Sequence, residues 1–260
     1  MRATYRSHGG SRDYWERRWL QIPADAGDLN LDRYPGKYAE PVMNRAIGMV
    51  LEAGCGAGRV LLHYHHCGKP IIGMDFIETA CAKIHAREPT VPVYAGDIAR
   101  LPFADAQFGA VLAFGLYHNL EHGAEKALLE TRRVLTTGGL LCASVRVDNI
   151  QNRIVDWLAD RNQPSAGERA FHKANYRHAE ISQMLTASGF EIERVEYVVN
   201  MPLAYKFRPL RHRSHRKFDE HVARGEGYRL SWFGAALQNT LVTLFPRSFC
   251  NIMVATARAV

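Results

Sequence analysis

Short apolar runs alternate with longer stretches of helical periodicity through the first two-thirds of the chain. Runs without polar alternation are typical of strands that are buried on both faces. Five runs predict strands, at Met49–Ala53, Ile71–Asp75, Val91–Asp97, Gly109–Gly115 and Gly139–Val147. The stretches between them predict helices at 59–68, 78–87 and 123–135, the last of which we expect to end at the glycine pair 138–139. This alternation predicts an α/β fold, with a parallel sheet covered by helices on both faces.

Two segments interrupt this rhythm. Residues 1–48 precede the first strand and are rich in Arg, Tyr and Trp, and residues 201–248 separate a strand at Phe190–Val199 from a closing strand at 251–259. A connection of that length inside an α/β core is usually functional. We therefore expect a cap at 1–48, a core at 49–200 and 249–260, and a lid at 201–248 that is inserted before the last strand.

Composition narrows the class of protein. The chain has 260 residues, of which 47% are hydrophobic and 23% charged, as in an ordinary globular protein. No apolar run approaches the roughly 18 residues of a membrane-spanning helix, and the first residues lack the apolar stretch of a secretory signal. Five cysteines without a C-x-x-C pair predict reduced thiols and a cytoplasmic location. The net charge of +7 allows an anionic partner.

Three glycines at alternate positions follow the first strand, in VLEAGCGAGR. Glycine is costly inside regular elements, so Gly54, Gly56 and Gly58 indicate a sharp turn that a ligand approaches closely. A dinucleotide fingerprint would need glycine where Arg59 stands, and no Gly-Lys-Ser/Thr of a phosphate-binding loop follows. The turn therefore suits a ligand without phosphates.

Carboxylates follow the next two strands. Asp75 ends the second strand, where it can accept both hydroxyls of a ribose, and Asp97 ends the third, where it can meet an adenine amino group. Both positions lie at the carboxyl ends of strands, where open α/β sheets bind their ligands.

These motifs carry a family resemblance. VLEAGCGAGR, GMD, GDIARLPFADAQFGAVLAFGLYHNL and ALLETRRVLTTGGLL resemble, in order and spacing, the class I S-adenosylmethionine-dependent methyltransferases of the small-molecule, type 11-like branch. The resemblance implies a Rossmann-like sheet of seven strands whose final strand is antiparallel. It also implies S-adenosylmethionine as the cofactor, with contacts from Glu52, Gly54, Cys55, Gly56, Gly58, Asp75, Phe76, Asp97, Ile98 and Phe114. One departure is visible, because the family usually has Phe-Asp where this chain has Phe108-Gly109.

The segment RDYWERRW resembles the aromatic cap helix that many members fold over the cofactor. It suggests that Tyr14 and Trp15 contact the cofactor's carboxylate and its sulfonium, a cation that suits an aromatic face. The alternative is a surface helix with a buried aromatic stripe.

The residues after the fourth strand are candidates for catalysis, because a base should face the sulfonium there. In GLYHNLEH, His118 and Tyr117 are the candidate bases, and the alternative is that His118 only shapes the pocket. The same letters spell H-x-x-E-H, but a zinc site of that type needs one helix face and these residues lie in a turn, so we expect no metal. His172 and Tyr176 are candidates for the acceptor site, although a loop that leads into a helix is the simpler interpretation.

The sequence thus predicts methyl transfer to an O, N or S atom of a small molecule by in-line displacement. The basic segment Arg208–Phe218 adds Arg211 and Arg213 as candidate contacts to an anionic acceptor, since charges this dense are expected to prevent tight packing without one. The amphipathic stretch with Leu237, Leu241 and Leu244 leaves a lipid-linked acceptor and a peripheral membrane contact open. A nucleic-acid acceptor and a non-catalytic cofactor-binding protein are further alternatives. The sequence fixes no oligomeric state.

Overall fold

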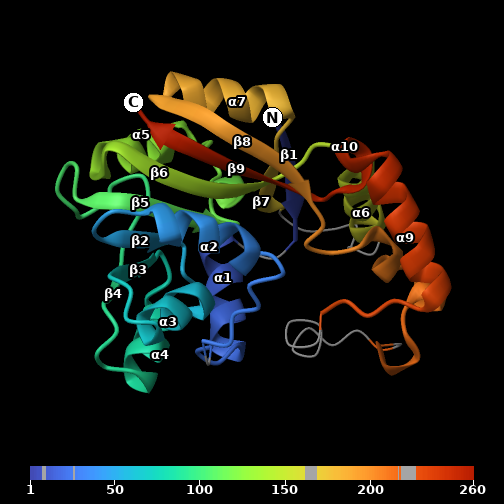
Figure 1. The fold of residues 1–260 in the computed structure, drawn as a ribbon. Coiled ribbons are helices and arrows are strands. Elements are labelled where there is room, and N and C mark those ends of the chain that lie inside the picture. Colours follow the sequence, from blue (N-terminus) through green and yellow to red (C-terminus); the bar gives the residue numbers. More distant parts are fainter. Residues whose placement is uncertain (8–9, 26, 162–168, 216, 218–226) are drawn as a thin grey trace.

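A computed structural model describes residues 1–7, 10–25, 27–161, 169–215, 217 and 227–260 (Figure 1). Its core is a seven-stranded sheet with the order β4-β3-β2-β5-β6-β9-β8. The strands are β2 (Val50–Ala53), β3 (Ile71–Asp75), β4 (Val93–Ala95), β5 (Phe108–Phe114), β6 (Leu135–Arg146), β8 (Phe190–Val198) and β9 (Ile252–Ala259). The pairs from β4 to β6 are parallel, whereas β9 is antiparallel to both β6 and β8. The predicted α/β sheet with an antiparallel final strand is confirmed.

Helices cover both faces of this sheet (Figure 1). Neighbouring residues of β5 belong to separate apolar clusters, Val111 to one face and Leu112 to the other, and both are completely buried. This explains why the strand lacks polar alternation. The helices are α1 (Ser11–Gln21), α2 (Gly36–Arg45), α3 (Arg59–His66), α4 (Glu78–Arg87), α5 (Glu125–Val134), α6 (Ile150–Asp160), α7 (His178–Ala187), α9 (Trp232–Leu244) and α10 (Pro246–Phe249). Short 3₁₀ turns are η1 (Tyr117–Asn119), η2 (Leu203–Lys206), η3 (Arg208–Leu210) and η4 (Arg213–His215).

The glycine pair 138–139 does not end a helix, contrary to the prediction. α5 ends at Val134 and β6 begins at Leu135, so both glycines lie within the strand. The register with β5 shifts there, because Leu135 pairs with Phe108 and pairing resumes only at Leu140. Gly138 has a φ of +79°, which lets the strand make this irregularity.

The unusual Phe108-Gly109 pair has a packing reason. A Cβ at Gly109 would lie 1.9 Å from the backbone oxygen of Ile47, in the segment that leads into β2. An aspartate at this position therefore does not fit, and the departure from the family pattern follows from that close approach.

A second, two-stranded sheet was not predicted. β1 (Arg2–Arg6) pairs antiparallel with β7 (Ala170–Asn175), with Thr4 opposite Lys173. The simpler interpretation of His172 as part of a loop is therefore wrong, because His172 lies inside β7. We call this two-stranded sheet the β1–β7 ribbon.

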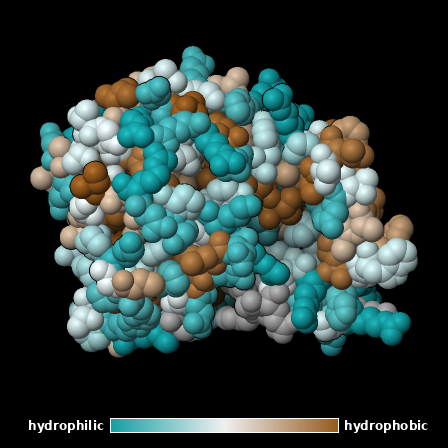
Figure 2. Space-filling view, in the orientation of Figure 1, coloured by the Kyte–Doolittle hydropathy of each residue, from teal (hydrophilic) through white to brown (hydrophobic). Residues whose placement is uncertain are grey.

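The inserted segment places its long helix, α9, against η2 and η3 at the edge of the molecule (Figure 1). The buried side of α9 holds Gly234 and Gln238, and Gln238 accepts a hydrogen bond from the backbone N–H of Ala204 at 3.1 Å. Apolar side chains face outward instead, as Figure 2 shows, with Trp232 83% and Leu244 63% exposed. Within the described part of the chain, no helix is both long and apolar enough to cross a membrane.

The basic segment is partly packed, contrary to expectation. His215 is buried, with Nδ1 3.0 Å from the Tyr205 hydroxyl, and Arg211 donates from Nε to the Tyr205 backbone oxygen at 2.7 Å. Local partners therefore replace the anion that we expected this segment to need, while Arg213 is exposed. Arg216 and Phe218, from the same segment, lie outside the described residues.

Candidate functional site

The three glycines form the turn between β2 and α3. Gly54, Gly56 and Gly58 all have left-handed backbones, with φ of +74°, +54° and +83°. The N–H groups of Gly54 and Cys55 donate to the backbone oxygen of Met74, at 2.7 and 3.0 Å, and thereby tie the turn to β3. Residues with a Cβ adopt this conformation only at a cost, so the glycines are required by geometry. We call residues 54–58 the glycine loop.

Asp75 lies directly beside the glycine loop. Its Oδ2 accepts a hydrogen bond from the N–H of Gly56 at 2.8 Å, and its Oδ1 accepts one from Ile77 at 3.0 Å. Burial raises the pKa of the Asp75 carboxyl, and these backbone N–H groups oppose that rise. The next residue, Phe76, is 47% exposed and lies under the guanidinium of Arg12. A buried carboxylate and an exposed ring thus stand side by side at the end of β3.

Glu52 is buried one strand away. Its Oε2 accepts a hydrogen bond from the N–H of Leu61 at 2.7 Å, in the first turn of α3. The carboxyl therefore satisfies one of the donors that a helix leaves free at its N-terminus. Burial, followed by repulsion from Asp75 and Asp25, raises the pKa of Glu52 to about 8. At neutral pH the carboxyl is therefore mostly protonated.

This pKa predicts a pH-dependent stability. In the unfolded chain Glu52 has its ordinary pKa of 4.5, so it ionises there at lower pH than in the folded protein. The free energy of unfolding therefore falls progressively between about pH 4.5 and 8. Glu52→Gln keeps an oxygen that accepts from the Leu61 N–H but cannot ionise. The melting temperature of this variant, relative to that of wild type, should therefore rise across that pH range. Thermal unfolding at each pH measures the gain, and parallel curves would contradict it. Glu52→Ala is the control, since it should lose about 1–3 kcal/mol by leaving the Leu61 N–H unpaired.

Helix α1 covers the glycine loop. A Cβ at Gly56 would lie only 2.5 Å from Cζ2 of Trp19, so the indole ring lies directly over this glycine. Trp15 stacks on Trp19, and Tyr14 packs edge-on against Trp15. Lys83 of α4 donates to the backbone oxygens of Trp19 and Leu20, both at 2.7 Å, which fixes the end of α1. Trp19 was missed among the candidates, although its spacing of four from Trp15 places both on one helix face.

The remaining cofactor candidates are Asp97 and Ile98, which follow β4, and Cys55 of the glycine loop. Asp97 is exposed two residues beyond β4, and its Oδ1 accepts a hydrogen bond from Ala99 at 2.9 Å. Ile98 is buried in the core. Cys55 is buried in the glycine loop, where a hydrogen bond with the Cys81 thiol and burial raise its pKa. The cysteine is therefore a protonated packing residue of the loop.

On the other side of the loop, β5 runs into η1, where the structure separates the two catalytic candidates. Tyr117 is completely buried in the core, and its hydroxyl lies 2.7 Å from Thr131 Oγ1 of α5. It points away from the glycine loop, so its prediction as a catalytic residue is wrong. The turn places neighbouring side chains on opposite sides, which the sequence pattern did not resolve.

His118 is 7% exposed and bonds to the backbone of Ser144. Its Nδ1 is buried without a hydrogen-bond partner among the described residues. Burial and the nearby cations Lys173 and Arg146 hold the pKa of His118 well below its usual range, so the ring is neutral at pH 7. A buried, neutral imidazole with one free nitrogen can accept a proton.

Tyr34, which we did not predict, packs at the ends of β5 and β6 near His118. The Tyr34 hydroxyl lies 2.8 Å from Ser144 Oγ, which also accepts the N–H of Gly115 at 2.8 Å. The Tyr34 ring packs edge-on against Phe114, the last residue of β5. No motif surrounds Tyr34 in the sequence, so only its packing reveals it.

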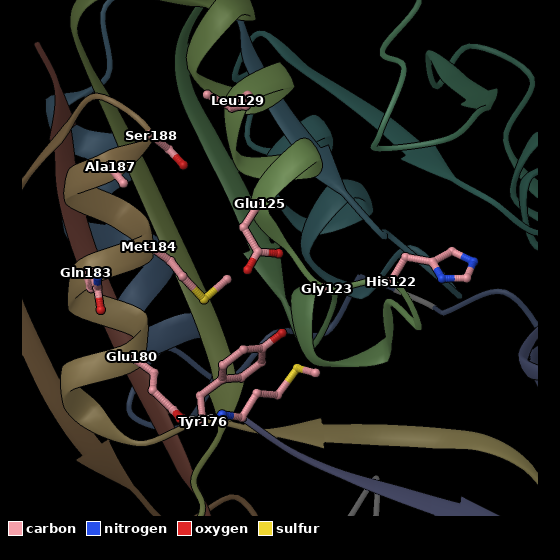
Figure 3. A pocket seen from close by; sticks show the side chains of 11 residues that line it. His122, Gly123, Glu125, Leu129, Tyr176, Glu180, Gln183, Met184, Ala187 and Ser188 are labelled. Carbon is pink, nitrogen blue, oxygen red and sulfur yellow. Dashed lines mark hydrogen bonds and ion pairs between the residues drawn. The ribbon is translucent and has the colours of Figure 1, made fainter.

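The two acceptor candidates of the β7 region separate. His172 packs edge-on against Tyr14 and thereby joins β7 to α1. Tyr176 instead lines a surface hollow of about 600 Å³ between α5 and α7, together with Glu125 and Met184 (Figure 3). Its hydroxyl is buried without a hydrogen-bond partner among the described residues, and its role as an acceptor contact stays a prediction. His122, of the H-x-x-E-H motif, lines the same hollow.

Comparison with known proteins agrees with this geometry. Residues 51–143 match the family model described as a methyltransferase domain. A protein of Encephalitozoon cuniculi that is named as a methyltransferase is 31% identical over 156 residues, which cover 55% of this chain and 70% of that protein. The chain belongs to the class I S-adenosylmethionine-dependent methyltransferases. The family, the fold and the cofactor that the sequence predicted are confirmed.

Two further matches, one relative and one solved structure, cover different shares of the chains compared. A protein of Mycolicibacterium smegmatis, named as an S-adenosylmethionine-dependent methyltransferase, is 33% identical over 144 residues. The match covers 55% of this chain and 52% of that relative, so the chain spans about half of its length. The crystal structure of geranyl diphosphate C-methyltransferase from Streptomyces coelicolor shares the fold, with a TM-score of 0.58, 12% identity and coverage of 96% and 98% of the two chains. The crystal structure shows the fold alone, and neither match specifies the acceptor.

Proposed function

We propose that this methyltransferase transfers the methyl group of S-adenosylmethionine to an O, N or S atom of a small molecule. The observation that carries the proposal is the buried Asp75 carboxylate, held against the N–H of Gly56 in the glycine loop. The carboxylate is anchored by backbone donors, so it is preorganised to accept hydrogen bonds from a ligand at the end of β3.

The residues around the glycine loop would hold the cofactor. In this proposal Asp75 accepts the ribose hydroxyls, and Phe76, Asp97 and Ile98 lie on the adenine side. The glycine loop and Glu52 face the methionine part, and α1 covers it with Tyr14 and Trp15. At Gly56 the bare backbone lies directly under the Trp19 ring, where a Cβ would collide with it, so α1 packs closely over the loop. When bound, the cofactor supplies an electrophilic methyl group on a sulfonium.

His118 would act on the acceptor side. It lies at the end of β5, where its neutral ring accepts the proton that an O–H, N–H or S–H acceptor must lose. Burial excludes water around the ring, which keeps the acceptor as the group that donates to Nδ1. Orientation and this proton are the contributions that a methyl transfer needs from the protein.

Replacement of Asp75 tests the proposal. Asp75→Ala should weaken S-adenosylmethionine binding by roughly 10- to 100-fold, because a hydrogen bond to a charged group contributes about 1.5–3 kcal/mol. Calorimetric titration with S-adenosylhomocysteine measures the change, and thermal unfolding controls for loss of the loop. Asp75→Asn keeps an acceptor oxygen and should lose less. Equal affinities of all three proteins would remove Asp75 from the site.

A lipid-linked acceptor is a second candidate because of the outward face of α9. Trp232, Phe233 and Leu244 are each more than half exposed there. An exposed apolar helix face near basic residues favours an anionic membrane surface. Co-sedimentation with anionic vesicles, lost on Trp232→Ser, would favour this acceptor, and no co-sedimentation would leave the water-soluble one.

A further inference from the structure

Four cationic side chains lie near one another, and two of them, Arg146 and Lys173, also act on His118. They come from four separate elements: Arg6 from β1, Arg146 from the end of β6, Lys173 from β7 and Lys206 from η2. Their mutual repulsion is direct, since Arg146 and Arg6 both lower the pKa of Lys173 and of Lys206. We call these four residues the basic cluster. The β1–β7 ribbon brings two of its members to the carboxyl ends of β5 and β6, where ligands of open α/β sheets bind.

Among the described residues, Asp156 of α6 is the carboxylate that pairs with the basic cluster. Asp156 of α6 is shared by three arginines, because Arg146 lies at 2.7 Å, Arg2 at 2.8 Å and Arg6 at 3.9 Å from its oxygens. Within the described part of the chain, neither Lys173 nor Lys206 forms an ion pair with a carboxylate. A surplus of partly buried positive charge destabilises a fold unless a ligand supplies the opposite charge.

Two buried nitrogen atoms of this region also lack partners. Nη1 of Arg146 and Nδ1 of His118 are both buried without a hydrogen-bond partner among the described residues. Their side chains are only 9% and 7% exposed, so water reaches them poorly. Buried polar atoms without partners are rare in proteins, and they are expected where a ligand completes the hydrogen bonding by accepting from Arg146 and donating to His118.

The titration of Lys173 agrees with this geometry. Burial lowers its pKa to about 7, with further lowering by Arg146 of β6, Arg18 of α1 and Arg6 of β1, whereas Asp156 of α6 opposes the shift. The charge of Lys173 also acts on His118 of η1, whose pKa it lowers. An anion bound here would raise both pKa values, since it favours the charged form of each group.

We propose that the basic cluster binds an oxyanion of the methyl acceptor, a carboxylate or a phosphate, and thereby places the acceptor's nucleophilic atom at His118. The inference rests on the proposed methyl transfer and names the class of its acceptor. It differs from the sequence prediction, which placed the anion at Arg211 and Arg213. The donors instead come from the β1–β7 ribbon, β6 and η2, and Arg146 and Lys173 offer the charged hydrogen bonds that oxyanions prefer.

Anion binding can be measured without catalysis. The intact protein is titrated with inorganic phosphate and, separately, with acetate, at constant ionic strength set with sodium chloride. Wild type is compared with Lys173→Met, with Lys206→Met and with Lys126→Met, a control in which an exposed lysine of α5 is lost. Binding of S-adenosylhomocysteine is measured for each protein in parallel.

We expect one of the two anions to bind wild type and Lys126→Met equally, and Lys173→Met at least 10-fold more weakly. Lys206→Met removes an exposed side chain, so it tests the cluster even if Lys173→Met fails to fold. Phosphate binding identifies a phosphate ester, and acetate binding a carboxylate. No binding of either anion, or equal binding by all four proteins, would overturn the inference while S-adenosylhomocysteine still binds. If wild type does not bind S-adenosylhomocysteine at all, that result would instead refute the proposed function.

Discussion

Gly56→Val should abolish S-adenosylmethionine binding, with an affinity loss of more than 100-fold. The φ of +54° is strained for any residue with a Cβ, and the new side chain would collide with the Trp19 ring, since even a Cβ would lie 2.5 Å from it. It would also disturb the N–H that donates to Asp75. Calorimetric titration with S-adenosylhomocysteine measures the loss. A valine variant that binds normally would refute the assignment of the glycine loop.

Backbone strain alone can be separated from occlusion of the site. Gly68, just after α3, also has a left-handed backbone with a φ of +70°, but a Cβ there would meet nothing within 4 Å. Gly68→Val should therefore introduce a similar backbone strain, of order 1–3 kcal/mol, and lower the melting temperature. Its affinity for the cofactor should stay unchanged. Equal losses of affinity in both variants would show that instability, and not the site, causes the effect.

His118→Ala should lower the rate of methyl transfer by about 10²–10⁴-fold with cofactor affinity intact. Protonation removes the basic nitrogen, so the rate should fall as the pH drops through the pKa of His118, which lies well below its usual 6.5. Because Lys173 contributes to that lowering, Lys173→Met should move this acidic limb to higher pH. Rates measured with a saturating acceptor across the pH range test both statements.

The neighbouring tyrosine is the control for this position. Tyr117→Phe removes only the hydroxyl that lies against Thr131 in the core, so the rate should stay near that of wild type. His118→Asn lacks a basic nitrogen. If this variant also kept most of the activity, the acceptor would lose its proton to solvent without the help of His118.

The cofactor half of the site could be predicted because its information is local. The glycines, Glu52 and Asp75 lie within 24 consecutive positions, and each follows directly from a strand end and a turn. Parallel strands align their carboxyl ends, so residues at those ends meet whatever the details of packing. The order of the apolar runs therefore predicted the sheet, and the strand ends bring Asp75 and the glycine loop together.

The acceptor half could not be predicted in the same way. Lys173 and Arg6 look like ordinary polar positions until β1 pairs with β7, and that pairing joins segments more than 160 residues apart. The orientation of Tyr117 depends on a single 3₁₀ turn, and the position of Tyr176 depends on where β7 ends. Neither leaves a periodic pattern, because one turn or one strand end is too short to show a period.

The β1–β7 ribbon also sets the order in which the protein can be completed on the ribosome. Arg2 is synthesised 173 residues before its partner Asn175, which therefore follows roughly 9–35 s later at about 5–20 residues per second. During that interval β2 to β5 can assemble, while the edge of β1 has no strand to pair with. Unpaired strand edges invite association between chains. Nascent chains of this protein are therefore most exposed to aggregation before β7 emerges, which makes slow translation or chaperone supply a practical lever on the yield of folded protein.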